Sequence, residues 1–205
     1  MRVLVACEES QAVTIAFRNR GHEAFSADFQ ECSGGHPEWH IQGDATAILD
    51  DGWDLLIAHP PCTYLSNAGA VHLFPGGVLS ESRYQKGLGG RELFMKFYNA
   101  PIKRICIENP VPSGVFLLPP HDQMIQPFHF GHPYQKRTLL WLKGLNHLVA
   151  TNNLGGGESS KVNGNWYNKG GKDRQKNRSK TFPGIAEAMA EQWGTDFVPI
   201  LELKA

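Results

Sequence analysis

The stretch HPPCTYLSNAG at residues 59–69 combines a thiol with a rigid backbone. It follows the apolar run WDLLIAH (53–59), which is typical of a buried strand, so Cys62 lies just beyond a strand end. Proline fixes φ at about −65° and restricts the residue before it, so the corner has few conformations. A cysteine thiolate is a strong nucleophile. Taken alone, the pattern favours a buried structural thiol, and a thiol positioned for attack on an electrophile is the alternative.

A carboxylate follows another predicted strand. KRICIEN (103–109) continues as ENP (108–110), and the carboxyl ends of parallel strands meet at one edge of a sheet, where ligands bind. If burial raises the pKa of Glu108, its carboxyl group can donate a proton or hydrogen bond to a substrate heteroatom. Arg137 in YQKRTLL could offset its charge. Together with Cys62 these residues would activate an electrophile, although each one alone has an ordinary structural explanation.

Further acids follow the first predicted strands. RVLVA (2–6) precedes CEES (7–10), HEAFSAD (22–28) ends at Asp28, and GDAT (43–46) comes later. An acid at the end of the second strand is where Rossmann-like folds bind a ribose hydroxyl pair. Aspartate also caps many helix-entry loops. We expect these acids to lie along the same edge of the sheet as the thiol.

The elements that must position these residues are short apolar runs alternating with helical segments. Strands are predicted at 2–6, 22–28, 53–59, 103–109 and 136–144, and helices at 10–21, 91–100 and 183–194. This alternation predicts a doubly wound α/β fold with a mostly parallel sheet. The length fits a single domain over 1–205.

For two of the helices the sequence also predicts which residues share a face. In the first, Ser10 is the predicted N-cap and Gly21 the stop, and the helical spacing selects one face made of Ala12, Ile15, Ala16 and Asn19. In the last, one face is predicted to be made of Ile185, Ala188, Met189 and Trp193.

Composition excludes several classes of function. Twenty Lys and Arg balance twenty Asp and Glu, so no global field attracts nucleic acid. No apolar run approaches the roughly 18 residues that span a bilayer, and the first apolar run is too short for a signal peptide. Four cysteines without a CxxC pair favour thiols in a reducing cytoplasm over disulfides or zinc. HPEWH (36–40) is predicted to be a surface loop, and no metal is expected.

Residues 151–180 are rich in Gly and Asn and carry a strong excess of Lys and Arg over acids. Such a composition favours a solvated loop. The alternative is an arm that contacts nucleic acid, with Trp166 or Tyr167 stacked on a base. Its phosphate contacts would come from Lys172, Arg174, Lys176 and Arg178.

The order of these motifs resembles the cytosine-C5 DNA methyltransferase family, particularly its short phage and prophage members. VLVACEESQAVTIAFRNRGHEAFSAD resembles the first strand, cofactor loop, helix and acidic strand end, and GDAT the next acidic contact. PPC resembles the catalytic Pro-Cys motif, and ENP the Glu-Asn-Val motif, with Pro110 in place of Val. QKR resembles half of the Gln-x-Arg-x-Arg motif, and FPGIAEAMAEQWG the C-terminal helix near the cofactor site.

The resemblance implies a Rossmann-like fold that uses S-adenosylmethionine to methylate carbon 5 of cytosine in DNA. Cys62 would add to carbon 6 of the base, Glu108 would contact ring nitrogen 3, and Arg137 would complete the catalytic set. Gln135 would contact DNA together with the basic segment. The implied cofactor contacts are Cys7, Glu8, Glu9, Ser10, Asp28, Asp44 and Pro61.

The sequence departs from the family pattern in three places. The cofactor loop lacks glycines, Leu139 replaces the second arginine, and the target-recognition region is reduced to the basic insertion. The protein therefore reads little DNA sequence, uses a specificity partner, or acts on single strands, RNA or nucleotides. A degenerate fold that only binds nucleic acid is a further alternative. An amino-methyltransferase fits less well, because His59 precedes the prolines and Cys62 follows them.

Overall fold

The computed structural model describes residues 1–157 and 179–195. Within these residues seven strands form one sheet of order β3-β2-β1-β4-β5-β7-β6. The strands are β1 (Arg2–Ala6), β2 (Glu23–Asp28), β3 (His40–Gln42), β4 (Leu55–Ala58), β5 (Arg104–Pro110), β6 (Gln123–Ile125) and β7 (Thr138–Lys143). The sheet is parallel except for β7, which runs antiparallel to both β5 and β6.

This strand order, with β7 antiparallel, is typical of the methyltransferase fold. The prediction of an α/β fold with a mostly parallel sheet is confirmed. All five predicted strands are present. The short strands β3 and β6 were not predicted, and β3 begins at His40, inside the stretch expected to be a surface loop.

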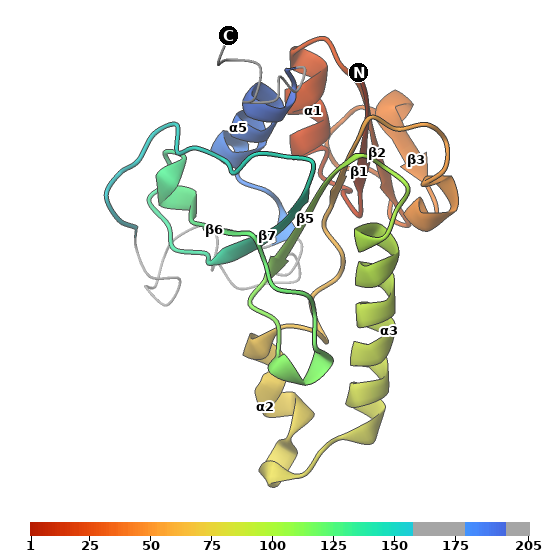
Figure 1. Ribbon diagram of the computed structural model, residues 1–205, viewed down its shortest axis with the longest axis vertical. Helices are drawn as coiled ribbons and strands as arrows, with labels where there is room; N and C mark the ends of the chain where they lie inside the picture. The colour runs from red at the N-terminus through yellow and green to blue at the C-terminus, as the bar shows by residue number, and fades with distance from the viewer. Residues whose placement is uncertain (158–178, 196–205) are drawn as a thin grey trace, which may run out of the picture.

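Helices cover both faces of the sheet. Helices α1 (Ala12–Asn19) and α5 (Pro183–Trp193) lie side by side on one face, and α3 (Glu81–Tyr98) lies on the other (Figure 1). The short α2 (Ala70–Leu73) lies beyond the edge at which β4 and β5 end. Helix α3 begins ten residues before the predicted 91–100 segment. No helix in the described part of the chain is long and apolar enough to cross a membrane.

Alternating strand residues build two cores. Val3 and Val5 face α1 and α5, where they pack with Phe17. Leu4 faces α3 and packs with Phe94. Because successive side chains of a strand point to opposite faces, one apolar run supplies both cores. The predicted buried face of α5 is confirmed: the residues named for it are all buried, namely Ile185, Ala188, Met189 and Trp193.

The start of α1 differs from the prediction. Ser10 does not cap the helix; Gln11 occupies the N-cap position without a side-chain bond. The Glu8 carboxylate instead accepts hydrogen bonds from the backbone N–H groups of Val13 (2.7 Å) and Thr14 (3.2 Å). A carboxylate satisfies these groups and is also stabilised by the helix dipole.

The predicted face of α1 is also wrong, except for Ala16. The buried residues of the helix are Val13, Thr14, Ala16 and Phe17. The spacing of small and apolar residues left the phase of this short helix ambiguous, and the large Phe17 side chain determines which face packs on the sheet.

Two glycines of α3 should respond oppositely to alanine. A Cβ at Gly87 would lie 2.1 Å from the ring of Phe116, which is 1% exposed, whereas one at Gly89 would meet nothing within 4 Å. Gly89→Ala should stabilise the protein by about 0.5–1 kcal/mol through helix propensity. Gly87→Ala should destabilise it by about 1–3 kcal/mol through overpacking. Urea unfolding of the two variants checks this, and equal shifts would contradict the packing of α3.

Candidate active site

The thiol and the carboxylate follow neighbouring strands. Strand β4 pairs in parallel with β5, with Ala58 opposite Ile107, so the two strands end at the same edge. His59 and Glu108 are the next residues along each strand. The backbone N–H of His59 still bonds the Ala6 carbonyl of β1 at 2.9 Å. The expected adjacency of the two strand ends is therefore confirmed.

Asn109 ties the Pro-Pro corner to β5. Its Nδ2 donates to the Pro60 carbonyl at 3.1 Å, and its side chain is buried. The Cys62 carbonyl accepts from the N–H groups of Leu65 (3.1 Å) and Ser66 (2.9 Å), which closes a turn around the half-buried thiol residue. The position of Cys62 is thus fixed by a hydrogen bond before it and a turn after it.

The loops that follow β4 and β5 remain joined beyond the sheet. Ser113 N–H bonds the Leu65 carbonyl at 2.7 Å, and Asn67 N–H bonds the Val111 carbonyl at 2.8 Å. The two loops extend together from this edge, with α2 at their far end (Figure 1). They form one unit, so a shift of the segment after Glu108 would also move the segment after Cys62.

Helix α3 holds the loop from another side. Arg83 Nη2 donates to the Thr63 carbonyl at 3.0 Å. The cations of Arg83 and Lys86 lie 5.0 Å and 5.4 Å from the centre of the Tyr64 ring, within cation–π range. Two positive charges therefore lie beside the loop that carries Cys62.

Glu108 is surrounded by compensating groups. Its Oε2 lies 3.1 Å from His59 Nδ1, and its Oε1 lies 4.0 Å from Lys136 Nζ. The Thr181 side chain hydrogen-bonds the carboxylate as well. The side chains of Glu108 and His59 are each 12% exposed. These three contacts come from three segments that are distant in sequence from Glu108 and from one another.

The charge state of Glu108 differs from the expectation. Burial alone would raise the pKa of the carboxyl group, but the hydrogen bond and charge of His59, followed by Lys136 and Thr181, lower the pKa to about 2. Burial also acts to lower the pKa of His59, yet the bond to Glu108 and the charges of Glu108 and Glu8 raise it overall. Each member of the pair therefore favours the charged form of the other.

The cation beside Glu108 is Lys136. Arg137 and Gln135 are both exposed, and Arg137 forms no ion pair within the described part of the chain. The half-buried Lys136 side chain, 19% exposed, points back toward the edge of the sheet. The predicted roles of Arg137 in catalysis and Gln135 in substrate binding remain predictions.

A second cluster lies at the ends of β1 and β2. Burial, together with the charges of Asp28 and Asp44, raises the pKa of the Cys7 thiol to about 12. Asp44 accepts from the backbone N–H of Thr46 (2.9 Å), which lowers its pKa and starts a short 3-10 turn. The structure thus brings these three predicted cofactor residues together.

The remaining predicted cofactor residues lie under or beside this cluster. Glu8 is occupied in capping α1, and burial raises its pKa. Glu9 is buried, Ser10 is half-buried and Pro61 is exposed. The Glu9 carbonyl accepts from Ser33 N–H at 2.7 Å, so the segment after β2 lies directly over this loop.

The β1–α1 loop reaches left-handed conformations without glycine. Cys7 has φ 59° and Gln11 has φ 58°. The buried Gln11 amide compensates by donating to the His36 carbonyl (2.7 Å) and accepting from the His36 N–H (3.1 Å). A Cβ at Gly34 would lie 2.5 Å from Gln11 Cβ, so Gly34 permits this close contact.

Several residues at these sites were missed by sequence reasoning. Phe29, directly after Asp28, is 73% exposed, which is unusual for a large aromatic side chain. His59 could have been found from the sequence, because it is the polar residue that ends the apolar run WDLLIAH and precedes the two prolines. Asn109 and Lys136 stand in the ENP and QKR motifs, but their roles, like that of Thr181, depend on which way each side chain points.

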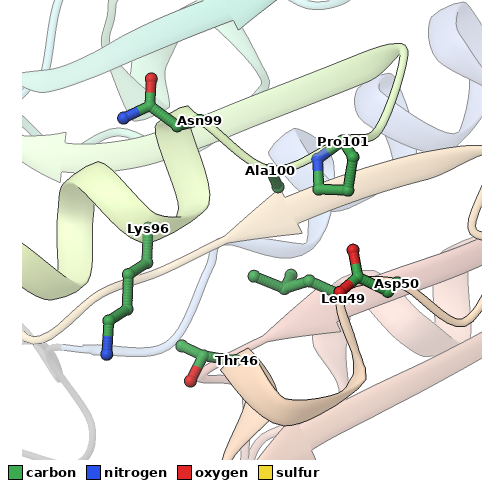
Figure 2. Close-up of a pocket in the computed structure, with 7 residues that line it drawn as sticks. All are labelled: Thr46, Leu49, Asp50, Lys96, Asn99, Ala100 and Pro101. Atoms are coloured by element: carbon green, nitrogen blue, oxygen red, sulfur yellow. The ribbon is translucent and has the colours of Figure 1, made fainter.

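A pocket lies between the 3-10 turn after Asp44 and the end of α3 (Figure 2). Its lining residues are Thr46, Leu49, Asp50, Lys96, Asn99, Ala100 and Pro101. None of the predicted catalytic or cofactor residues lines it. The four predicted phosphate contacts, Lys172, Arg174, Lys176 and Arg178, lie outside the described residues.

No protein-family model matches the sequence, and no curated protein matches it. Among solved structures, the chain is similar to a candidate DNA modification methyltransferase encoded within a prophage of E. coli. The sequences are 14% identical and the TM-score is 0.42. The match covers 69% of this chain and 46% of the other, so the chain spans less than half of that protein's length.

The Asn109 tie can be tested directly. Asn109→Ala should lower the free energy of unfolding by about 1–3 kcal/mol, because the Pro60 carbonyl loses its donor inside the protein. Asn67→Ala, at an exposed position of the following loop, should change stability by less than about 0.5 kcal/mol. Urea denaturation measures both, and a neutral Asn109→Ala would show that the corner is held without this bond.

Proposed function

We propose that this protein is an S-adenosylmethionine-dependent methyltransferase that modifies carbon 5 of cytosine in DNA through a covalent Cys62 adduct. The observation that carries the proposal is the linkage of Cys62 to Glu108. A thiol on a Pro-Pro corner and a carboxylate on the adjacent strand end are joined by the Asn109–Pro60 hydrogen bond. The strand order, typical of methyltransferases, is consistent with this chemistry.

Cys62 and Glu108 divide the work on the base. The thiolate of Cys62 forms a bond to carbon 6, while Glu108 contacts ring nitrogen 3 and stabilises the electron-rich ring. Once carbon 5 carries the methyl group, its proton passes to water, the carbon 5–carbon 6 double bond forms again, and the sulfur–carbon 6 bond breaks to release the thiolate. A base in duplex DNA must first leave the stack, at a cost of a few kcal/mol. The fixed corner places the thiol where the extruded ring can meet it.

The residues over β1 to β3 fit the proposed cofactor. The half-buried Asp28 carboxylate can accept from a ribose hydroxyl pair, and the exposed Phe29 ring beside it offers a surface for an adenine. Asp44 adds a second carboxylate. When bound, S-adenosylmethionine would supply the electrophilic methyl group. The Cys7 thiol, with its pKa raised to about 12, stays protonated in this cluster.

The described part of the chain also offers contacts for nucleic acid. Arg83 and Lys86 lie beside Tyr64, two residues after the proposed nucleophile. Cations near the reacting thiol can hold the phosphates that flank an extruded base, and such contacts do not depend on sequence. The basic segment 161–180 remains a predicted additional contact.

A mechanism-based trap tests the nucleophile. Duplex and single-stranded DNA containing 5-fluorocytosine, given with S-adenosylmethionine, should form a stable adduct, because fluorine cannot leave as a proton does. The adduct should map to Cys62 by peptide mass spectrometry and should be absent in Cys62→Ser. Cys106→Ser, which changes a buried thiol, should still form the adduct.

A comparison of substrates distinguishes the proposed cytosine-C5 methyltransferase from the alternative functions. Labelled methyl transfer is measured on duplex DNA, single-stranded DNA, RNA and cytidine nucleotides, and the modified base is identified by mass spectrometry. N4-methylcytosine or N6-methyladenine would point to an amino-methyltransferase. Cofactor binding without any product would favour the degenerate nucleic-acid-binding alternative. An adduct on another cysteine would contradict the mechanism.

Cofactor binding is predicted to depend on the end of β2. Asp28→Asn should weaken S-adenosylmethionine binding at least tenfold, because a charged acceptor of two hydroxyl groups is lost. Phe29→Ala should weaken it by a smaller factor. Asp50→Asn, an exposed acid after the 3-10 turn, serves as the matched control and should have no effect. Isothermal titration calorimetry measures all three, and unchanged affinity in Asp28→Asn would remove the ribose contact.

A further inference from the structure

His59 lies between two buried acids at the edge of the sheet. Its Nδ1 contacts Glu108 at the end of β5, and the charge of Glu8, from the loop between β1 and α1, acts on the same ring. Lys136, from the segment before β7, opposes them. In the part of the chain that the structure describes, these three charged groups act on the His59 ring from the elements around it.

The proposed chemistry needs a proton that Glu108 does not carry. Cysteine addition to carbon 6 pushes electron density onto ring nitrogen 3, which must then be protonated. The Glu108 carboxyl group, with a pKa of about 2, is ionised near neutral pH. A nearby ionisable group has to hold the proton until the base arrives. His59 hydrogen-bonds the carboxylate and can carry a proton, whereas the Thr181 hydroxyl, which also bonds it, does not titrate near neutral pH.

We propose, on the basis of the function above, that His59 is the positioning residue that stores this proton and passes it through Glu108 to the cytosine. The thiolate electron pair forms the sulfur–carbon 6 bond, and the displaced π pair moves through the ring to nitrogen 3. Nitrogen 3 takes a proton from Glu108, which takes one from His59 Nδ1. His59 ends neutral, Glu108 ends as the carboxylate, and the proton returns when the thiolate leaves.

The surroundings of His59 suit a proton that must be given up. Its other nitrogen, Nε2, is buried and has no hydrogen-bond partner among the described residues. Among the described residues, the imidazolium is therefore stabilised by one hydrogen bond and by the nearby charges of Glu108 and Glu8. An acid works best when its pKa lies near the working pH, and histidine titrates there. A second acceptor on Nε2 would bind the proton more tightly and oppose its transfer.

The first test follows the proton without requiring activity. NMR titration of the imidazole Cε1–H signals, with His59 identified by its absence in His59→Asn, should give a pKa above the ordinary value of 6.5. In Glu108→Gln it should fall below 6.5, because the partner charge is lost and burial remains. A His59 signal that titrates at or below 6.5 in the natural protein and is unmoved by Glu108→Gln would overturn the proposal.

The second test uses the pH profile of methyl transfer. Because the imidazolium is the active form, kcat should fall as pH rises through the His59 pKa. His59→Asn retains a donor toward Glu108 but cannot titrate, so it should lose about 100-fold or more in kcat, with little change in KM and no such alkaline decline. Lys136→Met removes an opposing cation and should move the decline to higher pH. His147→Asn, at an exposed histidine, should leave the profile unchanged.

These measurements separate failure of this inference from failure of the proposed function. If the natural protein forms no adduct and transfers no methyl group, the proposed function fails, and the NMR titration still decides whether His59 holds the proton. If the natural protein is active and His59→Asn keeps the same alkaline decline, the function stands and His59 is not the proton store.

Discussion

The Glu108 carboxylate, near the end of β5, is largely shielded from water, and much of the candidate site surrounds it. Removing an ion of this kind from water costs several kcal/mol unless charges and hydrogen bonds compensate. Glu108 obtains this compensation from His59 after β4, Lys136 before β7 and Thr181 before α5. These segments must therefore converge on one point. The antiparallel course of β7 beside β5 contributes to this, because it brings the start of β7 to the edge where the parallel strands end.

The same constraint explains the coupling between the thiol and the carboxylate. Asn109, the residue after Glu108, bonds the Pro60 carbonyl, and the loops beyond them exchange two further backbone bonds. A substitution that moves Glu108 should therefore also move Cys62. The Pro-Pro corner alone restricts the local backbone, but the hydrogen bonds to β5 determine where that rigid corner lies.

The sequence was most informative about the strands and least informative about side-chain direction. Apolar runs predicted five strands and the edge at which they end, because burial on both faces leaves a continuous signal. Strands β3 and β6 contain three residues each, which is too short for such a signal. The cation found beside Glu108 is Lys136, the neighbour of Arg137, because a shift of one residue before a strand decides which side chain turns inward. The Ser10 cap was chosen from local preference, and the more distant Glu8 carboxylate replaced it.

The sequence could not predict the charge state of Glu108, because the pKa of this carboxyl group depends on residues that are distant in sequence. Burial was expected to raise its pKa, and burial does act in that direction. The pKa is nevertheless lowered, because His59 and Lys136 lie close to the carboxylate. Both residues come from segments whose positions depend on the complete sheet. A pKa in the interior is the balance of desolvation and neighbouring charges, so it follows from the fold and not from the residue type.

Two thiols follow strands of the same sheet, and the charged groups on the two strand ends differ. Cys7, after β1, faces Asp28 and Asp44, which oppose ionisation and keep it protonated. Cys62, after β4, follows His59 by three residues, at the end of the edge where His59 and Lys136 provide positive charge. In the proposed mechanism only a thiolate attacks carbon 6, so the raised pKa of Cys7 favours Cys62 as the nucleophile of that proposal. On the same proposal, the acidic half of the edge would hold a cofactor with hydroxyl groups to donate, and the half with His59 and Lys136 would receive the base.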